Sequence, residues 1–372
     1  MTQPHISMPL PGPRARAMIA RDAEVISPSY PRDYPFVMDH GRGTLLAGEP
    51  AMSFLCQSGT EAVEGALKLA RYVTKRPRFI GFLGGFHGRT MGSLAFTSSK
   101  YTQQLGFAPA MPGVTHVPYP DPYRPLFAGE DQGKAVIDYL RMLFERNVPA
   151  AEVAAILVEP LQGEGGYVVP PPGFLAGLRA LCDEHGILLI FDEVQSGIGR
   201  TGRMFACEHE GVAPDIMSLA KGLGSGLPIG AVVARRSLMS QWKRGAHGNT
   251  YGGNPLACAA ANATLDLVGG GLADNAATVG AHFQQRLREL QQDHPCIGQV
   301  RGRGLMIGME LVESRCWARS TCRIRITGAS STCRSSPAGR PRPRSWRTAR
   351  PWSTAAAVRC GGRPSTATRP SS

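Results

Sequence analysis

Short apolar runs alternate along this chain with segments whose apolar residues recur at helical spacing. The runs predict buried strands near residues 79–83, 155–158, 187–191, 216–220 and 229–234. The helical spacing predicts helices near residues 60–74, 173–185, 254–268 and 274–292. This alternation predicts an α/β fold, in which helices cover both faces of a mostly parallel sheet.

The chain of 372 residues is long enough for one large domain and a smaller one. We expect the large domain over residues 51–270, preceded by an N-terminal remnant over residues 1–50. A truncated smaller domain is expected over residues 271–313, and it includes a strand-like stretch from Val300 to Leu311. Residues 314–372 form a tail of different composition.

Reactive side chains follow two of the predicted strands. Asp192 follows the run that ends at Phe191, and Lys221 follows the run that ends at Ala220, with Gly222 directly after it. Taken singly, such residues serve turns and helix caps more often than chemistry. An acid and an amine at neighbouring strand ends, however, suit pyridoxal phosphate, whose ring nitrogen pairs with an acid and whose aldehyde bonds a lysine.

A phosphate site is predicted where the first strong helical pattern begins. Ser58 and Glu61 fit a capping box, so a helix begins here and presents free N–H groups that attract a phosphate. Gly59 lets the backbone approach such a group closely. Phe86 follows another strand and is placed to stack on a planar ring, and Arg89 has the fork geometry that binds a carboxylate.

Six motifs occur in a fixed order between residues 56 and 268: SGTEA, FHGRT, EPLQGEGG, FDEVQSGIGRTG, LAKGLGSGLPIGA and GNTYGGNP. With these motifs the chain resembles the class III (fold type I) pyridoxal-phosphate aminotransferases, in the acetylornithine, ornithine and 4-aminobutyrate group. The stretch VRGRGLMIGMEL, which ends at Leu311, adds a less distinctive match. The resemblance implies a homodimeric enzyme that moves an amino group from an amino acid or ω-amino acid to a 2-oxo acid such as 2-oxoglutarate.

The resemblance also assigns roles to the matching residues. Lys221 is the lysine that bonds the cofactor and carries protons, and Asp192 keeps the ring nitrogen protonated. Gln195 bonds the ring hydroxyl, while Val194 and Phe86 pack on the two ring faces. The remaining cofactor residues are Ser58, Gly59, Thr60 and His87, joined by Thr250 from the partner subunit. The expected substrate residues are Arg89, Glu164 and Asn249.

The charge of the chain is unevenly distributed. The formal net charge is +13, and residues 314–372 hold 13 of the 41 basic residues and none of the 28 acidic ones. Residues 1–313 are therefore formally neutral. The tail is rich in Arg, Ser and Pro and lacks apolar periodicity, so we expect it to be disordered. Two interpretations stay open: an arginine-rich arm that binds nucleic acid, and a shifted reading frame of a GC-rich gene. We favour the second and expect no nucleic-acid partner.

The resemblance breaks at both ends. The chain passes almost directly from Thr44 to Phe54, where the family has several tens of residues, and the matching C-terminal part stops near Val312. We therefore expect the catalytic residues to be present in a chain that folds poorly or has weak activity. Racemisation or aminomutation on the same scaffold, and a truncated inactive product, are the alternative functions.

Composition excludes other classes of protein. No apolar run approaches the roughly 18 residues of a membrane helix, and no charged and apolar leader opens the chain, so we expect a cytoplasmic enzyme without a membrane partner. The cysteines before the tail lack the spacing of metal sites, and we expect neither metal nor disulfides. They are Cys56, Cys182, Cys207, Cys258 and Cys296.

Overall fold

The computed structural model of the chain describes residues 13–27, 45–46 and 49–312. All of these residues belong to one compact unit, residues 1–323. The tail over residues 314–372 and most of the segment before Phe54 lie outside the described residues, so the expectations for them stay untested. The division into a large and a smaller domain also stays a prediction.

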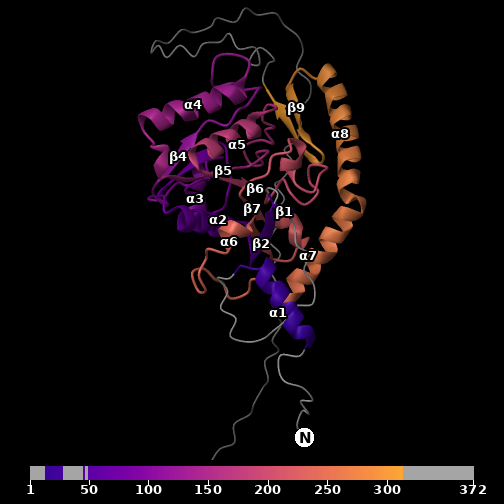
Figure 1. The fold of residues 1–372 in the computed structure, drawn as a ribbon. Coiled ribbons are helices and arrows are strands. Elements are labelled where there is room, and N and C mark those ends of the chain that lie inside the picture. Colours follow the sequence, from indigo (N-terminus) through magenta and orange to yellow (C-terminus); the bar gives the residue numbers. More distant parts are fainter. Residues whose placement is uncertain (1–12, 28–44, 47–48, 313–372) are drawn as a thin grey trace, which may run out of the picture. The chain divides into compact units, whose positions relative to one another are not determined.

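An eight-stranded sheet forms the centre of the fold, in the order β1-β2-β8-β7-β6-β5-β3-β4 (Figure 1). Strands β4, β3, β5, β6 and β7 run parallel, whereas β8, β2 and β1 continue the sheet in antiparallel pairs. The predicted α/β fold with a mostly parallel sheet is confirmed. The strands are β1 (Leu45–Leu46), β2 (Glu49–Cys56), β3 (Arg78–Phe82), β4 (Val114–Val117), β5 (Val153–Val158), β6 (Leu188–Asp192), β7 (Ile216–Leu219) and β8 (Gly230–Arg235).

Helices cover both faces of this sheet because its strands are apolar on both sides. On β5, Ile156 and Val158 pack into one core with α4 (Gln132–Arg146) and α5 (Phe174–His185), whereas Leu157 packs into a second core with α2 (Gly59–Thr74). Figure 1 shows α4 and α5 together, apart from α2. The other helices of this part are α1 (Pro13–Val25), α3 (Met91–Leu94) and α6 (Arg236–Met239), with 3-10 turns η1 (Tyr101–Gln103), η2 (Ala150–Glu152), η3 (Ala206–His209) and η4 (Lys221–Gly224).

The C-terminal part of the described chain begins with a bent helical run. It consists of α7 (Pro255–Leu267), a π turn η5 (Val268–Leu272) and α8 (Ala273–Asp293), and it bends at Gly271, whose φ is +128°. The single strand-like stretch predicted from Val300 to Leu311 is a hairpin of β9 (Ile297–Arg303) and β10 (Met306–Leu311). The prediction missed the tight turn between these strands, where Gly304 adopts a φ of +54° that glycine favours.

Sequence patterns also missed β2, β4 and α4. Strand β2 begins with Glu49 and Pro50 and is only half-buried on one side, which weakens its apolar signal. Helix α4 begins at an N-cap, Asp131, whose side chain accepts a hydrogen bond from the N–H of Lys134. Its apolar residues face only one core, so its pattern is diluted by polar positions.

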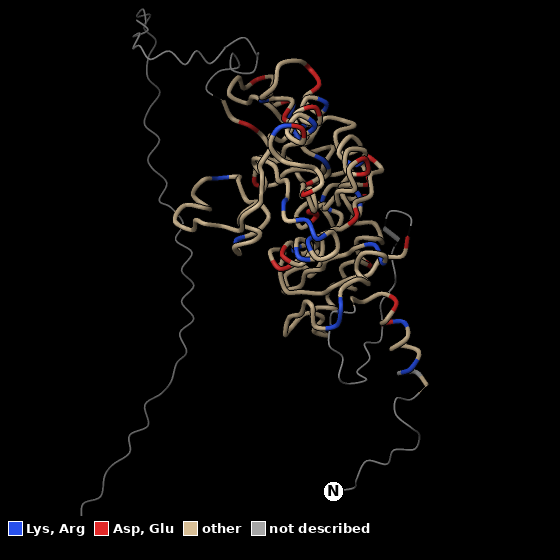
Figure 2. Tube along the Cα trace, turned by 60° about the vertical axis from the view of Figure 1, so that its left-hand side comes forward, with Lys and Arg blue, Asp and Glu red and all other residues tan. Residues whose placement is uncertain are grey.

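One helical run, Pro255–Asp293, is long and apolar enough by length and composition to cross a membrane. Its most apolar window has a mean hydropathy of 1.3. A single run of this kind is weak evidence, because helices of soluble proteins pass the same test. Basic and acidic residues are interspersed along the described chain (Figure 2), as expected from the balance in residues 1–313.

We predict that Leu157→Ala lowers the free energy of unfolding by about 2–5 kcal/mol, because it leaves a cavity at a fully buried position in β5. Leu126 is 68% exposed, and its replacement by alanine is expected to change that free energy by less than about 0.5 kcal/mol. Urea denaturation of both variants measures the difference. Equal losses in the two variants would contradict the assigned core.

Candidate active site

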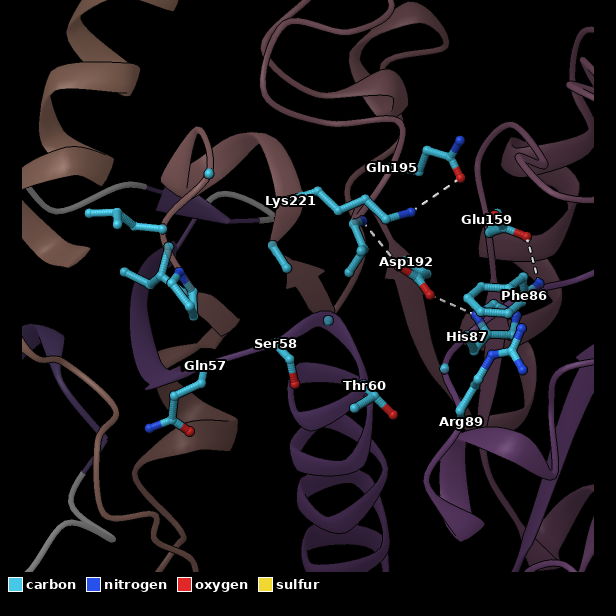
Figure 3. Close-up of a pocket in the computed structure, with 18 residues that line it drawn as sticks. Gln57, Ser58, Thr60, Phe86, His87, Arg89, Glu159, Asp192, Gln195 and Lys221 are labelled. Carbon is cyan, nitrogen blue, oxygen red and sulfur yellow. Dashed lines mark hydrogen bonds and ion pairs between the residues drawn. The ribbon is translucent and has the colours of Figure 1, made fainter. Parts of the chain in front are cut away.

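Three neighbouring parallel strands deliver reactive side chains to one edge of the sheet. Glu159 follows β5, Asp192 is the last residue of β6, and Lys221 comes two residues after β7. All three line a cavity of about 500 Å³ (Figure 3). The carboxyl ends of parallel strands meet at the same edge, which is where α/β proteins bind their ligands. Predicted residues that line this cavity are Ser58, Gly59, Thr60, Phe86, His87, Arg89, Asp192, Val194, Gln195 and Lys221.

The N-terminus of α2 forms the floor of the cavity. The hydroxyl of Ser58 accepts a hydrogen bond from the N–H of Glu61, as the capping box predicts, while the Glu61 carboxylate binds the N–H of Gln57. Among the described residues, no group accepts the N–H of Gly59 or Thr60. Two free amides at the positive end of a 16-residue helix are an anion site.

The hydroxyl of Thr60 is already engaged beside the cavity. It lies 2.8 Å from the Thr90 hydroxyl and 2.6 Å from the Ser93 hydroxyl. The carboxylate of Glu64 accepts hydrogen bonds from Thr90 Oγ1 and from the N–H groups of Gly92 and Ser93. Thr60 therefore offers the cavity its backbone N–H, and this hydroxyl network holds the FHGRT segment against α2.

Lys221 adopts a backbone conformation that is costly for a lysine. Its φ of +44° lies in the left-handed region, where L-residues lose roughly 1–2 kcal/mol. Such outliers cluster at functional sites, because the surrounding structure must hold them. The side chain extends into the cavity, and its Nζ donates a hydrogen bond of 3.3 Å to Gln195 Oε1 (Figure 3).

A buried ion pair forms part of one cavity wall. His87 Nδ1 is 2.7 Å from Asp192 Oδ2, and both side chains are at most 3% exposed. The other carboxylate oxygen of Asp192 accepts the N–H of Val194 at 3.0 Å. His87, which was predicted beside the cofactor, lines the cavity and also binds the carboxylate of Asp192.

Glu159 is a buried acid that the motif analysis did not single out. Its Oε2 accepts the N–H of Phe86 at 3.2 Å, and its Oε1 accepts the N–H of Gly163 at 3.1 Å. Burial, opposed in part by His87, raises the pKa of Glu159 to about 7. Burial disfavours the protonation of His87, but the hydrogen bond and charge of Asp192 outweigh it and raise the pKa of His87.

The side walls of the cavity consist of flat or branched apolar groups. A Cβ on Gly59 would lie 2.7 Å from Cγ1 of Val194, so only glycine fits between α2 and that side chain.

The guanidinium of Arg89 lies 5.9 Å from the centre of the Phe86 ring. Within residues 13–27, 45–46 and 49–312, Arg89 has no carboxylate partner, which leaves it available to an anionic ligand.

Three predicted residues do not line this cavity. Glu164 is exposed and forms an ion pair of 3.3 Å with Lys100. The side chain of Asn249 binds the carbonyl of Leu55 and the N–H of Gly252. Thr250 is exposed on the loop between α6 and α7. The structure therefore brings together the predicted cofactor residues except Thr250, and of the expected substrate residues only Arg89.

Several lining residues were missed by sequence reasoning. Glu159 carried the same signal as Asp192, an acid directly after a buried strand, but was overlooked beside Glu164. Gln57 directly precedes the capping box, and no sequence pattern indicated that its side chain would line a cavity. The turn after Lys221 completes the lining with Gly226, Leu227, Pro228 and Ile229.

Comparisons with known proteins agree with this geometry. A sequence profile of the family described as aminotransferase class-III matches residues 39–328. An acetylornithine aminotransferase of Methanopyrus kandleri is 48% identical over 259 residues, which are 69% of this chain and 60% of that protein. A 4-aminobutyrate aminotransferase of Mycobacterium leprae is 42% identical over 266 residues, which are 70% of this chain and 60% of that protein.

Solved structures show the same fold. An amine transaminase from an uncultivated Pseudomonas species, in its PLP-bound form, aligns with a TM-score of 0.69 at 32% identity. This alignment covers 83% of this chain and 75% of that one. An ornithine aminotransferase from Toxoplasma gondii aligns with a TM-score of 0.63 at 35% identity, over 81% of this chain and 68% of that one.

The fold is that of the fold type I transaminases. Asp192 and Lys221 lie at the carboxyl ends of neighbouring strands in its mostly parallel sheet. The chain belongs to the class III aminotransferase family. It spans about 60% of the length of the curated relatives it matches.

The raised pKa of Glu159 gives a prediction for stability against pH. The unfolded chain releases this proton near the ordinary value of 4.5, whereas the folded chain keeps it up to about 7. The contribution of Glu159 to stability is therefore complete below pH 4.5 and is lost as the pH rises through 7. Glu159→Gln removes this proton, so its free energy of unfolding declines less between pH 4.5 and 7 than that of the parent chain.

Urea denaturation across this pH range measures the two slopes. Glu145 is exposed, and Glu145→Gln serves as the matched control, with the slope of the parent chain. A Glu159→Gln variant that keeps the parental slope would show that this carboxyl group titrates normally in the folded chain.

Proposed function

We propose that this chain transfers the amino group of an amino acid or ω-amino acid to a 2-oxo acid such as 2-oxoglutarate, with pyridoxal phosphate as cofactor. One observation carries the proposal: the Lys221 amine and the Asp192 carboxylate converge on a cavity whose floor is the free N-terminus of α2. The named relatives, acetylornithine and 4-aminobutyrate aminotransferases, support the same reaction and the same class of substrate.

The residues of the cavity fit this cofactor. The free N–H groups of Gly59 and Thr60 supply donors for a phosphate, and the absence of a side chain at Gly59 lets Val194 approach them closely. Asp192 supplies a carboxylate for a protonated ring nitrogen, and Gln195 supplies an amide for the ring hydroxyl. The bound cofactor supplies an aldehyde that bonds amines and a ring that accepts electrons.

The side chains then divide the work of the reaction. With the cofactor bound, Lys221 Nζ would be the group that takes the proton from the substrate Cα and carries it within the cavity. This step needs an unprotonated amine. Asp192, held in place by His87 and by the N–H of Val194, keeps its carboxylate directed at the ring nitrogen. Phe86 and Val194 line the same cavity and would pack on the two faces of the ring.

Arg89 is the proposed partner of a substrate carboxylate, because it lines the cavity and has no carboxylate partner within the described chain. Glu164 is proposed on the substrate side, as the family resemblance implies, and it forms an exposed ion pair with Lys100. Thr250 lies outside the cavity of its own chain and is exposed, which supports the proposal that it serves the partner subunit of a homodimer. We also propose that the enzyme acts in the cytoplasm, as expected from its metabolic relatives.

Racemisation or aminomutation on the same scaffold has no observation in its favour here. A transaminase requires a 2-oxo acid to complete its cycle, whereas a racemase does not. Release of a carbonyl product that depends on added 2-oxo acid therefore separates the two functions. The full chain with cofactor, incubated with N-acetylornithine or 4-aminobutyrate, is the material for this assay.

We predict that added pyridoxal phosphate gives the full chain a new visible absorbance band that Lys221→Ala lacks, because the alanine variant has no amine at this position. Lys134→Ala is the matched control: Lys134 is exposed and pairs with Asp138 on α4, and the band should persist. Absorbance spectra before and after dialysis measure the retained cofactor. Coinciding spectra of the parent chain and Lys221→Ala would contradict the proposal.

A further inference from the structure

The loop that carries Thr250 is fastened to the segment that leads into the cavity floor. This loop, residues 247–253, follows α6 and precedes α7 in the chain. The loop contacts β2 and α2, which are far from it in the sequence. His247, for example, bonds Lys68, which lies 179 residues earlier. The phosphate cradle is the N-terminus of α2 with the free N–H groups of Gly59 and Thr60. The same side chains therefore hold the loop and the segment that leads into this cradle.

Asn249 makes the central contacts of this attachment. Its Nδ2 donates to the carbonyl of Leu55 at 2.9 Å, and its Oδ1 accepts the N–H of Gly252 at 2.5 Å. Oδ1 also accepts from Nε2 of Gln57 at 3.3 Å. A side-chain amide oxygen has two lone pairs, so both are used. Asn249 therefore bridges its own loop and the last residues before Ser58.

Gly252 shows how tightly the loop is fitted. A Cβ at this position would lie 2.2 Å from Asn249 Oδ1 and 2.2 Å from the carbonyl oxygen of Leu55. Both distances are far below van der Waals contact, and a backbone carbonyl of β2 cannot move aside without disturbing the strand. Only glycine allows the Asn249 amide to reach Leu55.

A second attachment lies at the start of the loop. The ring of His247 stacks on Phe54 with 4.5 Å between ring centres, and its Nδ1 lies 2.8 Å from Nζ of Lys68. Burial and the charge of Lys68, opposed by Glu64, lower the pKa of His247 to about 4. The neutral ring therefore accepts the Lys68 hydrogen bond near neutral pH, and it fixes the loop where it meets α2.

We propose that Asn249 is a positioning residue, which latches the Thr250 loop to Leu55 and Gln57 and so sets the shape of the phosphate cradle. This inference rests on the proposed function, since Thr250 is taken to serve a phosphate. It assigns Asn249 a role different from the substrate contact implied by family resemblance. The contacts favour the latch, because the amide is occupied by the protein and does not line the cavity.

Two variants remove the latch in different ways. Asn249→Ala deletes the amide, and Gly252→Ala leaves it intact but forces it away from Leu55. Asn254→Ala is the matched control. The Asn254 side chain accepts the N–H of Ala257 at the start of α7 and donates to the carbonyl of Tyr251 at the end of the loop, so its loss perturbs the neighbouring segment without removing the contacts of Asn249 with Leu55, Gln57 and Gly252.

The first measurement is amide hydrogen exchange in the full chain without cofactor. The latch predicts that the Gly252 amide exchanges about tenfold faster in Asn249→Ala than in the parent chain, because its acceptor is lost. In Asn254→Ala the Gly252 amide should keep its protection. Equal exchange in the parent chain and Asn249→Ala would overturn the latch, whatever the cofactor result.

The second measurement separates the latch from a substrate contact. The latch predicts that Asn249→Ala and Gly252→Ala weaken pyridoxal phosphate binding about tenfold in a fluorescence titration, while the KM values for amino donor and 2-oxo acid change less than about twofold. A raised KM with unchanged cofactor affinity would overturn the latch and assign Asn249 to the substrate. Failure of the parent chain to bind cofactor would count against the proposed function, and the exchange measurement would still decide the latch.

Discussion

The convergence of strand ends is the constraint on which this site depends. Because β5, β6 and β7 run parallel and adjacent, their carboxyl ends must meet, and with them Glu159, Asp192 and Lys221. The hydrophobic burial that assembles the sheet therefore also brings the reactive groups together. The turns after the strands then set their orientation, as the left-handed backbone of Lys221 shows.

Electrostatic interactions among these side chains then alter their proton affinities. Two buried acids and an imidazole share one wall of the cavity, and each alters the proton affinity of another. The His87–Asp192 contact holds the Asp192 carboxylate in place at the cavity wall. The positive end of α2 lies below the same cavity, so one side favours a cation and the floor favours an anion. The cavity therefore has an acidic wall and an anion-binding floor.

Much of this arrangement could be predicted from sequence, because its signals are local. A buried strand followed by Asp192 or Lys221, and a helix that begins after Ser58, are readable from adjacent residues. The position of Asn249 could not be predicted, since its partners Leu55 and Gln57 are remote in the chain and depend on the antiparallel pairing of β2 with β8. The role of Glu159 likewise depends on the fold, because its pKa reflects burial and the neighbouring His87.

The central claim is that one amine, that of Lys221, bonds the cofactor across the cavity from Asp192. Borohydride reduction of the full chain with pyridoxal phosphate, followed by mass mapping of its peptides, tests this claim directly. The account predicts a stable cofactor adduct on the peptide that contains Lys221 and on no other peptide. An adduct at another lysine, such as Lys68 or Lys243, or no adduct at all, would contradict it.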